Sequence, residues 1–197
     1  MDDNLADLLT WRGPKSVQET LIEIERNASQ FREIFTADIA AIDDKLEEAM
    51  ASEASAFANT SEISEMFATW FRHYRLNNGK RMHGLCAMIV SQIFDEEISR
   101  EASIRLAAAV QLFHHHTLVH DDVYDADTVR RGWPTSSAAY EAFFDRTNGN
   151  PREANVVFSS SSWRRGTALA IAYGKICSAA SRQLIATLPI SPKQRID

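Results

Sequence analysis

HHHTLVHDDVYDADTVRRGWPT, residues His114–Thr135, is the stretch from which the fold of this 197-residue chain is predicted. It contains Asp121, Asp122 and Asp125 in the pattern D-D-x-x-D. Positions three and four apart share one face of an α-helix, so these carboxylates crowd one patch at a helix end. Like charges that lie so close repel one another, and magnesium, which prefers oxygen ligands, would relieve the repulsion.

Two arginines follow the carboxylates. Arg130 and Arg131 come shortly after Asp125 and directly before Gly132. Guanidinium groups bind phosphate oxygens through their charge and their forked geometry. Carboxylates, magnesium and arginine together predict a site for a diphosphate, which the metal would hold from one side and arginine from the other.

Three other interpretations of the stretch were open. Acidic residues near a helix end often form a solvated face, and the residues alone do not exclude this. An EF-hand loop that began at Asp121 would need glycine at its sixth position, where the chain has Ala126. His116 and His120 have the spacing of zinc ligands on a helix, but no H-E-x-x-H pattern or neighbouring cysteine accompanies them.

The segment HDDVYDADTVRRGWPT resembles the first aspartate-rich motif of the trans-isoprenyl diphosphate synthases, also called the polyprenyl synthetase family. That motif reads H-D-D-x-x-D, a short spacer, and R-R-G-x-P-T. Upstream, Asn78-Gly79-Lys80-Arg81 resembles the G-G-K-R segment of the family, and downstream GTALAIA, residues 166–172, resembles the small-residue helix that follows. The order and spacing of three segments make the resemblance specific, and it covers about residues 65–188.

The resemblance implies an all-α fold, a helical bundle of the isoprenoid synthase type around a central cavity. Because the family has a second aspartate-rich motif, whereas only Asp145 and Asp197 follow Asp127 here, the chain is expected to be the N-terminal, truncated part of that fold. It is expected to form one helical domain over residues 1–197, flexible over about 1–13, and to assemble as a homodimer or heteromer.

The resemblance also implies roles for individual residues. Three aspartates are implied to bind Mg²⁺ and to be catalytic: Asp121, Asp122 and Asp125. Arg130 matches the allylic diphosphate arginine of the family. The isopentenyl diphosphate is implied to be bound by Lys80, His114 and Arg131. Two residues one helical turn before the aspartates are implied to set the product length: His116 and Thr117.

The chain departs from the family pattern at three further positions. His83 and Gly84 stand where the family has arginine and then proline. A histidine would contact phosphate only when protonated, so His83 is the weakest member of the predicted isopentenyl site. Lys175 follows Gly174 where the family usually has aspartate, which reverses a charge near the cavity.

The predicted function is that of a prenyltransferase, incomplete as it stands, which condenses isopentenyl diphosphate with an allylic diphosphate. His116 is of intermediate size and Thr117 is small, so a short-to-medium product is expected, with geranylgeranyl diphosphate favoured over farnesyl diphosphate. One alternative is a non-catalytic, synthase-like subunit that binds and regulates a partner. Another is a fragment of a class I terpene cyclase, which R-R-G-x-P-T makes the weaker alternative.

Composition excludes several other classes. A net charge of -6 argues against non-specific nucleic-acid binding, which needs a basic surface. No apolar run approaches the ~18 residues of a transmembrane span. The acidic N-terminus, MDDNLADLLTW, lacks the positive region of a signal peptide. Cys86 and Cys177 lie in apolar, helix-like stretches and are expected to be reduced, buried thiols of a cytoplasmic protein.

Apolar residues at steps of three and four predict a series of helices. The first is expected from about residue 16 to Leu46, with an interruption in the Ala- and Ser-rich segment 51–61. Further helices are expected at about 62–76, 80–93, 104–124, 137–144 and 163–188, and a loop at 147–162.

Overall fold

The computed structural model describes residues 26, 29–31, 33–56, 79–95, 97–148 and 161–191, and it divides the chain into two compact units, Met1–Ala40 and Ala41–Asp197. The described residues of the first unit are almost all helical, and the rings of Phe31 and Phe35 lie 4.7 Å apart. The single domain stays a prediction. The flexible lead-in predicted for residues 1–13 lies outside the described residues.

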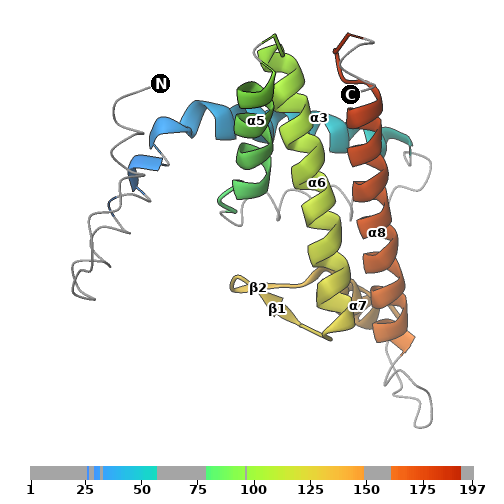
Figure 1. Cartoon of the computed structure of the whole chain (residues 1–197). Coiled ribbons are helices and arrows are strands. Elements are labelled where there is room, and N and C mark those ends of the chain that lie inside the picture. The colour runs from blue at the N-terminus through green and yellow to red at the C-terminus, as the bar shows by residue number, and fades with distance from the viewer. Residues whose placement is uncertain are drawn as a thin grey trace. The chain divides into compact units, whose positions relative to one another are not determined.

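The second unit contains the predicted site. Helix α3 (Thr36–Ala56) continues into this unit, and the elements that follow are α5 (Met82–Phe94), α6 (Arg100–Tyr124), β1 (Val129–Arg130), β2 (Trp133–Pro134), α7 (Ser136–Asn148) and α8 (Ser161–Ala186). Helix α6 packs against α5 and α8, and α7 packs against α8 (Figure 1). The all-α class is therefore confirmed, with one two-stranded hairpin among the described residues.

Helix α6 is the centre of this unit because small residues let its neighbours approach closely. Ala107, Ala108 and Ala109 are fully buried. A Cβ atom added to Gly84 of α5 would lie 2.9 Å from the backbone oxygen of Ala107, so this contact requires glycine. On the other side, the Ser181 hydroxyl of α8 donates a 2.7 Å hydrogen bond to the Ala109 carbonyl.

A second close contact joins α7 to α8. A Cβ atom on Gly166 would lie 2.6 Å from the Glu141 nitrogen and 2.8 Å from the Ser137 oxygen. Both are backbone atoms, which side-chain motion cannot clear. Tyr140 of α7 is 1% exposed, so α7 also contributes a side chain to the core.

Two helix boundaries differ from the prediction. Helix α6 begins at Arg100 rather than near Ile104, because the Ser99 hydroxyl accepts a 3.1 Å hydrogen bond from the Ala102 N–H and caps the helix. Helix α3 continues to Ala56, so the predicted interruption is wrong for residues 51–56, and the rest of the segment, 57–61, lies outside the described residues. Alanine is the strongest helix former, and it outweighs the serines there.

The other predicted helices are confirmed to within a few residues, apart from 62–76, which lies outside the described residues along with most of the predicted 147–162 loop. Within the described part of the chain, every helix is too short or too polar to cross a membrane.

An ion pair fixes the residues that precede α5. The Arg81 side chain is 2% exposed, and its Nε donates to Asp43 Oδ1 at 2.6 Å. Removing one partner of a buried pair leaves the other charge without compensation. We therefore expect Asp43→Ala to lower the free energy of unfolding by about 3 kcal/mol, measured by urea denaturation.

Asp44→Ala is the matched control, because Asp44 is the exposed neighbour on the same helix. Its effect is expected to stay within about 0.5 kcal/mol. Equal losses in the two variants would show that the ion pair does not hold this region.

Candidate functional site

The three aspartates occupy the last turn of α6, but their exposure differs. Asp122 is buried, whereas Asp121 and Asp125 are exposed. Asp125 caps the helix, and its N–H donates to the Asp121 carbonyl at 2.8 Å. The three residues therefore lie at one helix end as predicted, with one carboxylate buried and two exposed.

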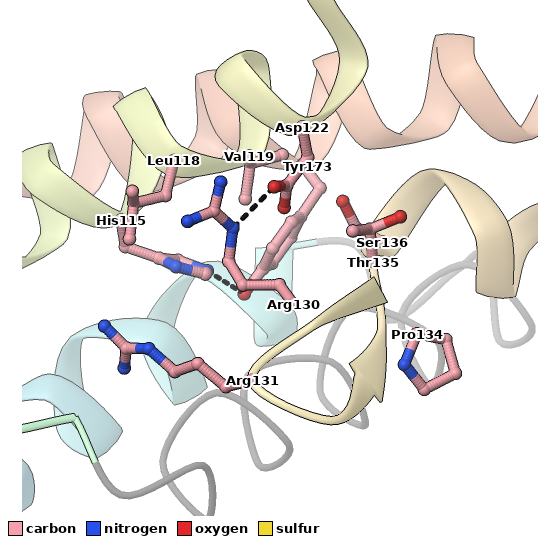
Figure 2. Close-up of a pocket in the computed structure, with 10 residues that line it drawn as sticks. All are labelled: His115, Leu118, Val119, Asp122, Arg130, Arg131, Pro134, Thr135, Ser136 and Tyr173. Atoms are coloured by element: carbon pink, nitrogen blue, oxygen red, sulfur yellow. Dashed lines mark hydrogen bonds and ion pairs between the residues drawn. The ribbon is translucent and has the colours of Figure 1, made fainter. Parts of the chain in front are cut away.

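Arg130 compensates the charge of the first two aspartates. Its Nε donates to Asp122 Oδ1 at 2.5 Å, and its Nη2 donates to Asp121 Oδ2 at 3.2 Å. Burial raises the pKa of Asp122, and the hydrogen bond and charge of Arg130 oppose that rise. Figure 2 shows the Arg130 guanidinium directed at Asp122. One arginine thus ties the hairpin to the end of α6.

The hairpin that carries Arg130 was not predicted from the sequence. Its two turn residues, Arg131 and Gly132, both have positive φ angles, 54° and 81°. Two-residue hairpin turns commonly need positive φ at both positions. Figure 2 shows the consequence: Arg130 points toward Asp122, and Arg131 extends away from it. The two predicted phosphate-binding arginines therefore serve different places.

A cavity of about 60 Å³ lies between α6, α8 and the hairpin. Its walls combine apolar and polar groups: His115, Leu118, Val119, Asp122, Arg130 and Tyr173. The Nε2 atom of His115 and the hydroxyl of Tyr173 lie 2.9 Å apart and form a hydrogen bond across it (Figure 2).

The sequence interpretation did not single out His115 or Tyr173. Burial, reinforced by nearby positive groups of which Arg81 is the largest, lowers the pKa of His115 to about 3. The imidazole is therefore neutral at physiological pH. Three successive histidines on one helix must point in different directions, and this was the one signal that His115 would face the core.

The residues predicted for the second diphosphate lie on α5, just before it, on α6 and on the hairpin. Lys80 is exposed directly before that helix, and Arg131 Nη1 is 3.0 Å from a Cβ atom built on Gly79. His83 and His114 stack with ring centroids 3.8 Å apart and planes inclined by 25°. Of the four predicted contacts, only His83 and His114 are shown to touch each other.

The two residues predicted to set product length differ in environment. His116 is half-buried and packs against His120, with ring centroids 4.3 Å apart. Both rings face Gly174 of α8, where an added Cβ atom would lie 2.6 Å from His120 Nε2. Thr117 is exposed, and its hydroxyl donates to the His114 carbonyl at 2.7 Å. Their role in product length stays a prediction.

The donors at the end of α6 are suited to magnesium by type. Magnesium commonly takes one or two carboxylates together with substrate phosphates and water. Asp121 and Asp125 offer exposed oxygens of this kind. In the described residues, no three His, Cys, Asp or Glu side chains are gathered into a ready-made cluster, and Arg130 spans Asp121 and Asp122 instead. The site therefore fits an ion that is completed by substrate rather than an all-protein cage.

Comparison with known proteins agrees with this geometry. The sequence matches the polyprenyl synthetase family over residues 64–193, more than half of the chain. The chain belongs to the polyprenyl synthetase family. It is 40% identical over 68 residues to geranylgeranyl diphosphate synthase of Sulfolobus acidocaldarius, a match that covers 34% of this chain and 20% of that protein.

Two further similarities extend over more of this polyprenyl synthetase chain. It is 28% identical over 113 residues to heptaprenyl diphosphate synthase component 2 of Geobacillus stearothermophilus, covering 57% of this chain and 32% of that protein. Its fold resembles that of geranylgeranyl pyrophosphate synthase from Corynebacterium glutamicum, complexed with isoprenyl diphosphate and magnesium, with a TM-score of 0.62 and 20% identity. That match covers 79% of this chain and 42% of the other. The chain thus spans less than half the length of each of these proteins.

The buried His115 predicts a dependence of stability on pH. Its pKa is about 3 in the folded protein and ~6.5 in an unfolded chain. The unfolded chain binds the extra proton between these values, so stability is full above pH ~6.5 and falls as the pH decreases. We expect a loss of about 3 kcal/mol from this residue by pH ~4, read by urea denaturation.

His115→Gln should flatten this slope, because glutamine does not titrate. Proton NMR of the wild-type protein gives an independent reading: the His115 ring resonances are expected to stay constant while the pH passes through ~6.5. A His115 resonance that titrated in that range would contradict the buried neutral state.

Proposed function

We propose that this chain takes part in prenyl transfer, in which isopentenyl diphosphate condenses with an allylic diphosphate in the presence of Mg²⁺. The observation that carries the proposal is the contact of Arg130 with Asp121 and Asp122, which joins acidic and basic phosphate-site residues in one place. Membership of the polyprenyl synthetase family and similarity to a named geranylgeranyl diphosphate synthase support it.

The end of α6 is the proposed site of the allylic diphosphate. Asp121 and Asp125 would hold Mg²⁺ through exposed oxygens, and Asp122 would contribute from the buried side. Arg130 would move its contact from the carboxylates to the diphosphate, since its guanidinium suits either partner. When bound, magnesium supplies positive charge that stabilises the departing diphosphate. In this proposal, binding of the allylic diphosphate depends on Arg130 leaving Asp121 and Asp122 for the diphosphate.

Isopentenyl diphosphate is proposed to bind beside the start of α5, through Lys80, His114 and Arg131. Lys80 and Arg131 are exposed, and they form no ion pair within the part of the chain that the structure describes. They therefore remain able to bind an anion. The hairpin joins this site to the first, because Arg130 and Arg131 are consecutive residues.

The active assembly is proposed to contain more than one copy of this chain, or a partner chain. The end of α5 exposes large apolar side chains, with Ile93 67% and Phe94 84% exposed. Exposed apolar groups that lie together commonly mark an interface. The homodimer and the heteromer remain the two proposed forms. The prediction that both thiols are buried is wrong for Cys86, which is exposed, whereas Cys177 is buried. An exposed free thiol suits a reducing compartment, so we propose the cytoplasm.

A second candidate function is that of a non-catalytic subunit that binds and regulates a partner synthase. Similarity to a protein named as component 2 of a heptaprenyl diphosphate synthase favours it. His83 and Lys175, where the family has other residues, also favour it. The two functions differ in one measurable property, because only the first predicts product formation. The terpene cyclase stays the weaker alternative.

The aspartate site predicts coupled binding of metal and diphosphate. Calorimetry should show that Mg²⁺ and geranyl diphosphate each bind more tightly in the presence of the other, by about tenfold, because each supplies the counter-charge for the other. Asp121→Asn should abolish this coupling. Asp145→Asn, an exposed aspartate on α7, is the control and should preserve it. Binding of the two ligands without coupling would exclude the proposed magnesium site.

The position of His116 predicts an effect on product length. In an assembly that supplies the rest of the synthase fold, with isopentenyl and geranyl diphosphates as substrates, the main product is expected to be geranylgeranyl rather than farnesyl diphosphate, identified by chromatography. His116→Ala should lengthen the product by opening space one turn before the aspartates. Thr117→Ser, which changes little volume, is the control. An active protein whose product length is the same in all three forms would place the limit elsewhere.

A further inference from the structure

A stacked pair of histidines, His83 and His114, joins α5 to α6 beside the proposed isopentenyl diphosphate site. His83 lies in the first turn of α5 and is exposed, whereas His114 lies on α6 and is half-buried. Their ring centroids are 3.8 Å apart. Two imidazoles at this distance cannot both carry a proton without strong repulsion. A charge on one ring is therefore felt directly by the other.

The groups around the pair are cationic. The charged groups that face His114 are His83 on α5 and Arg130 and Arg131 on the hairpin. Lys80 lies directly before α5 and is exposed. Arg81, which is buried and precedes α5, is already paired with Asp43. The two rings thus sit where a positive charge is disfavoured in the free protein and where an anion would reverse that preference.

The start of α5 adds to the attraction for an anion. A helix N-terminus carries a partial positive charge and exposes N–H groups. In this helix of 13 residues, the N–H groups of Gly84 and Leu85 are already used, by Gln111 Oε1 and by the Arg81 carbonyl. An anion near His83 would therefore feel the partial positive charge of the helix terminus and the charges of Lys80 and Arg131, and it would not bind these two N–H groups.

Burial, the neighbouring His83 and the two hairpin arginines all lower the pKa of His114. Arg130 is paired with Asp121 and Asp122, so a diphosphate beside Lys80 and Arg131 would chiefly cancel the repulsion from Arg131 and favour an imidazolium. The sign of the linkage follows. Because binding raises the affinity of the pair for protons, the additional binding energy is full at low pH and is lost as the pH rises through the pKa of the complex.

We propose that the His83–His114 pair takes up one proton when a diphosphate binds beside Lys80 and Arg131, so that this site binds diphosphate more tightly as the pH falls. This inference rests on the proposed isopentenyl diphosphate site and adds the way in which that site responds to pH. An arginine at position 83 would be charged at every physiological pH. Histidine at that position makes the positive charge conditional on the ligand.

Calorimetry of isopentenyl diphosphate binding to the full chain, at about pH 6 and about pH 8, tests the proposal. Titrations in two buffers with different ionisation enthalpies count the protons that are taken up. The wild-type protein is expected to lose about tenfold in affinity between the two pH values, in excess of any change from the ligand itself. His83→Arg should bind with nearly equal affinity at both, and His83→Gln should bind weakly at both.

Because His83 is exposed, both variants should retain the fold, which their thermal unfolding checks. A second measurement needs no variant: nitrogen-15 NMR of the imidazoles should show the pKa of His114 rising when isopentenyl diphosphate is added. Tight binding with the same pH dependence in wild type and His83→Arg would overturn the inference and leave the proposed function standing. Absence of binding at either pH, with and without Mg²⁺, would overturn both.

Discussion

The requirement to compensate two adjacent carboxylates at the end of α6 governs the arrangement of the site. Asp122 is buried, and an isolated buried carboxylate would be costly. Arg130 meets that requirement, and to do so the chain after α6 must return as a hairpin that places the guanidinium against the helix. The Thr135 hydroxyl, which donates to the Asp127 carbonyl at 2.7 Å, closes the base of this return. One electrostatic constraint thus fixes the hairpin and the start of α7.

The same constraint separates the cations into two kinds. Arg81 and Arg130 are paired with aspartates and hold structure in the form described. Lys80 and Arg131, their neighbours in sequence, are exposed. Each pair of adjacent basic residues therefore combines one side chain that positions the backbone with one that is available to an anion. Arg131 has a positive φ angle of 54°, a backbone conformation that is strained for a residue with a side chain. In this conformation its side chain points away from that of Arg130 (Figure 2).

The sequence predicted those features that depend on neighbours in the chain. The spacing of Asp121, Asp122 and Asp125 places them at one helix end, and apolar periodicity predicted α5, α7 and α8 to within a few residues. It did not predict the His83–His114 stack or the His115–Tyr173 hydrogen bond, because each joins residues on different helices. The wrong interruption near Ala51 and the late start predicted for α6 have local causes, the helix preference of alanine and the cap at Ser99.

The three successive histidines of helix α6 lie on different faces of the helix, and each makes a different contact. His115 turns inward to Tyr173 and stays neutral, His116 packs with His120 against Gly174, and His114 reaches His83 at the surface. The same residue type therefore contributes a core hydrogen bond, a helix contact and a titratable group within a single turn. His114 lies beside the exposed His83 and near Arg131 at the proposed diphosphate site, so it is the histidine of this run whose charge should respond to a ligand. Identical side chains acquire different chemistry from the direction in which the helix presents them.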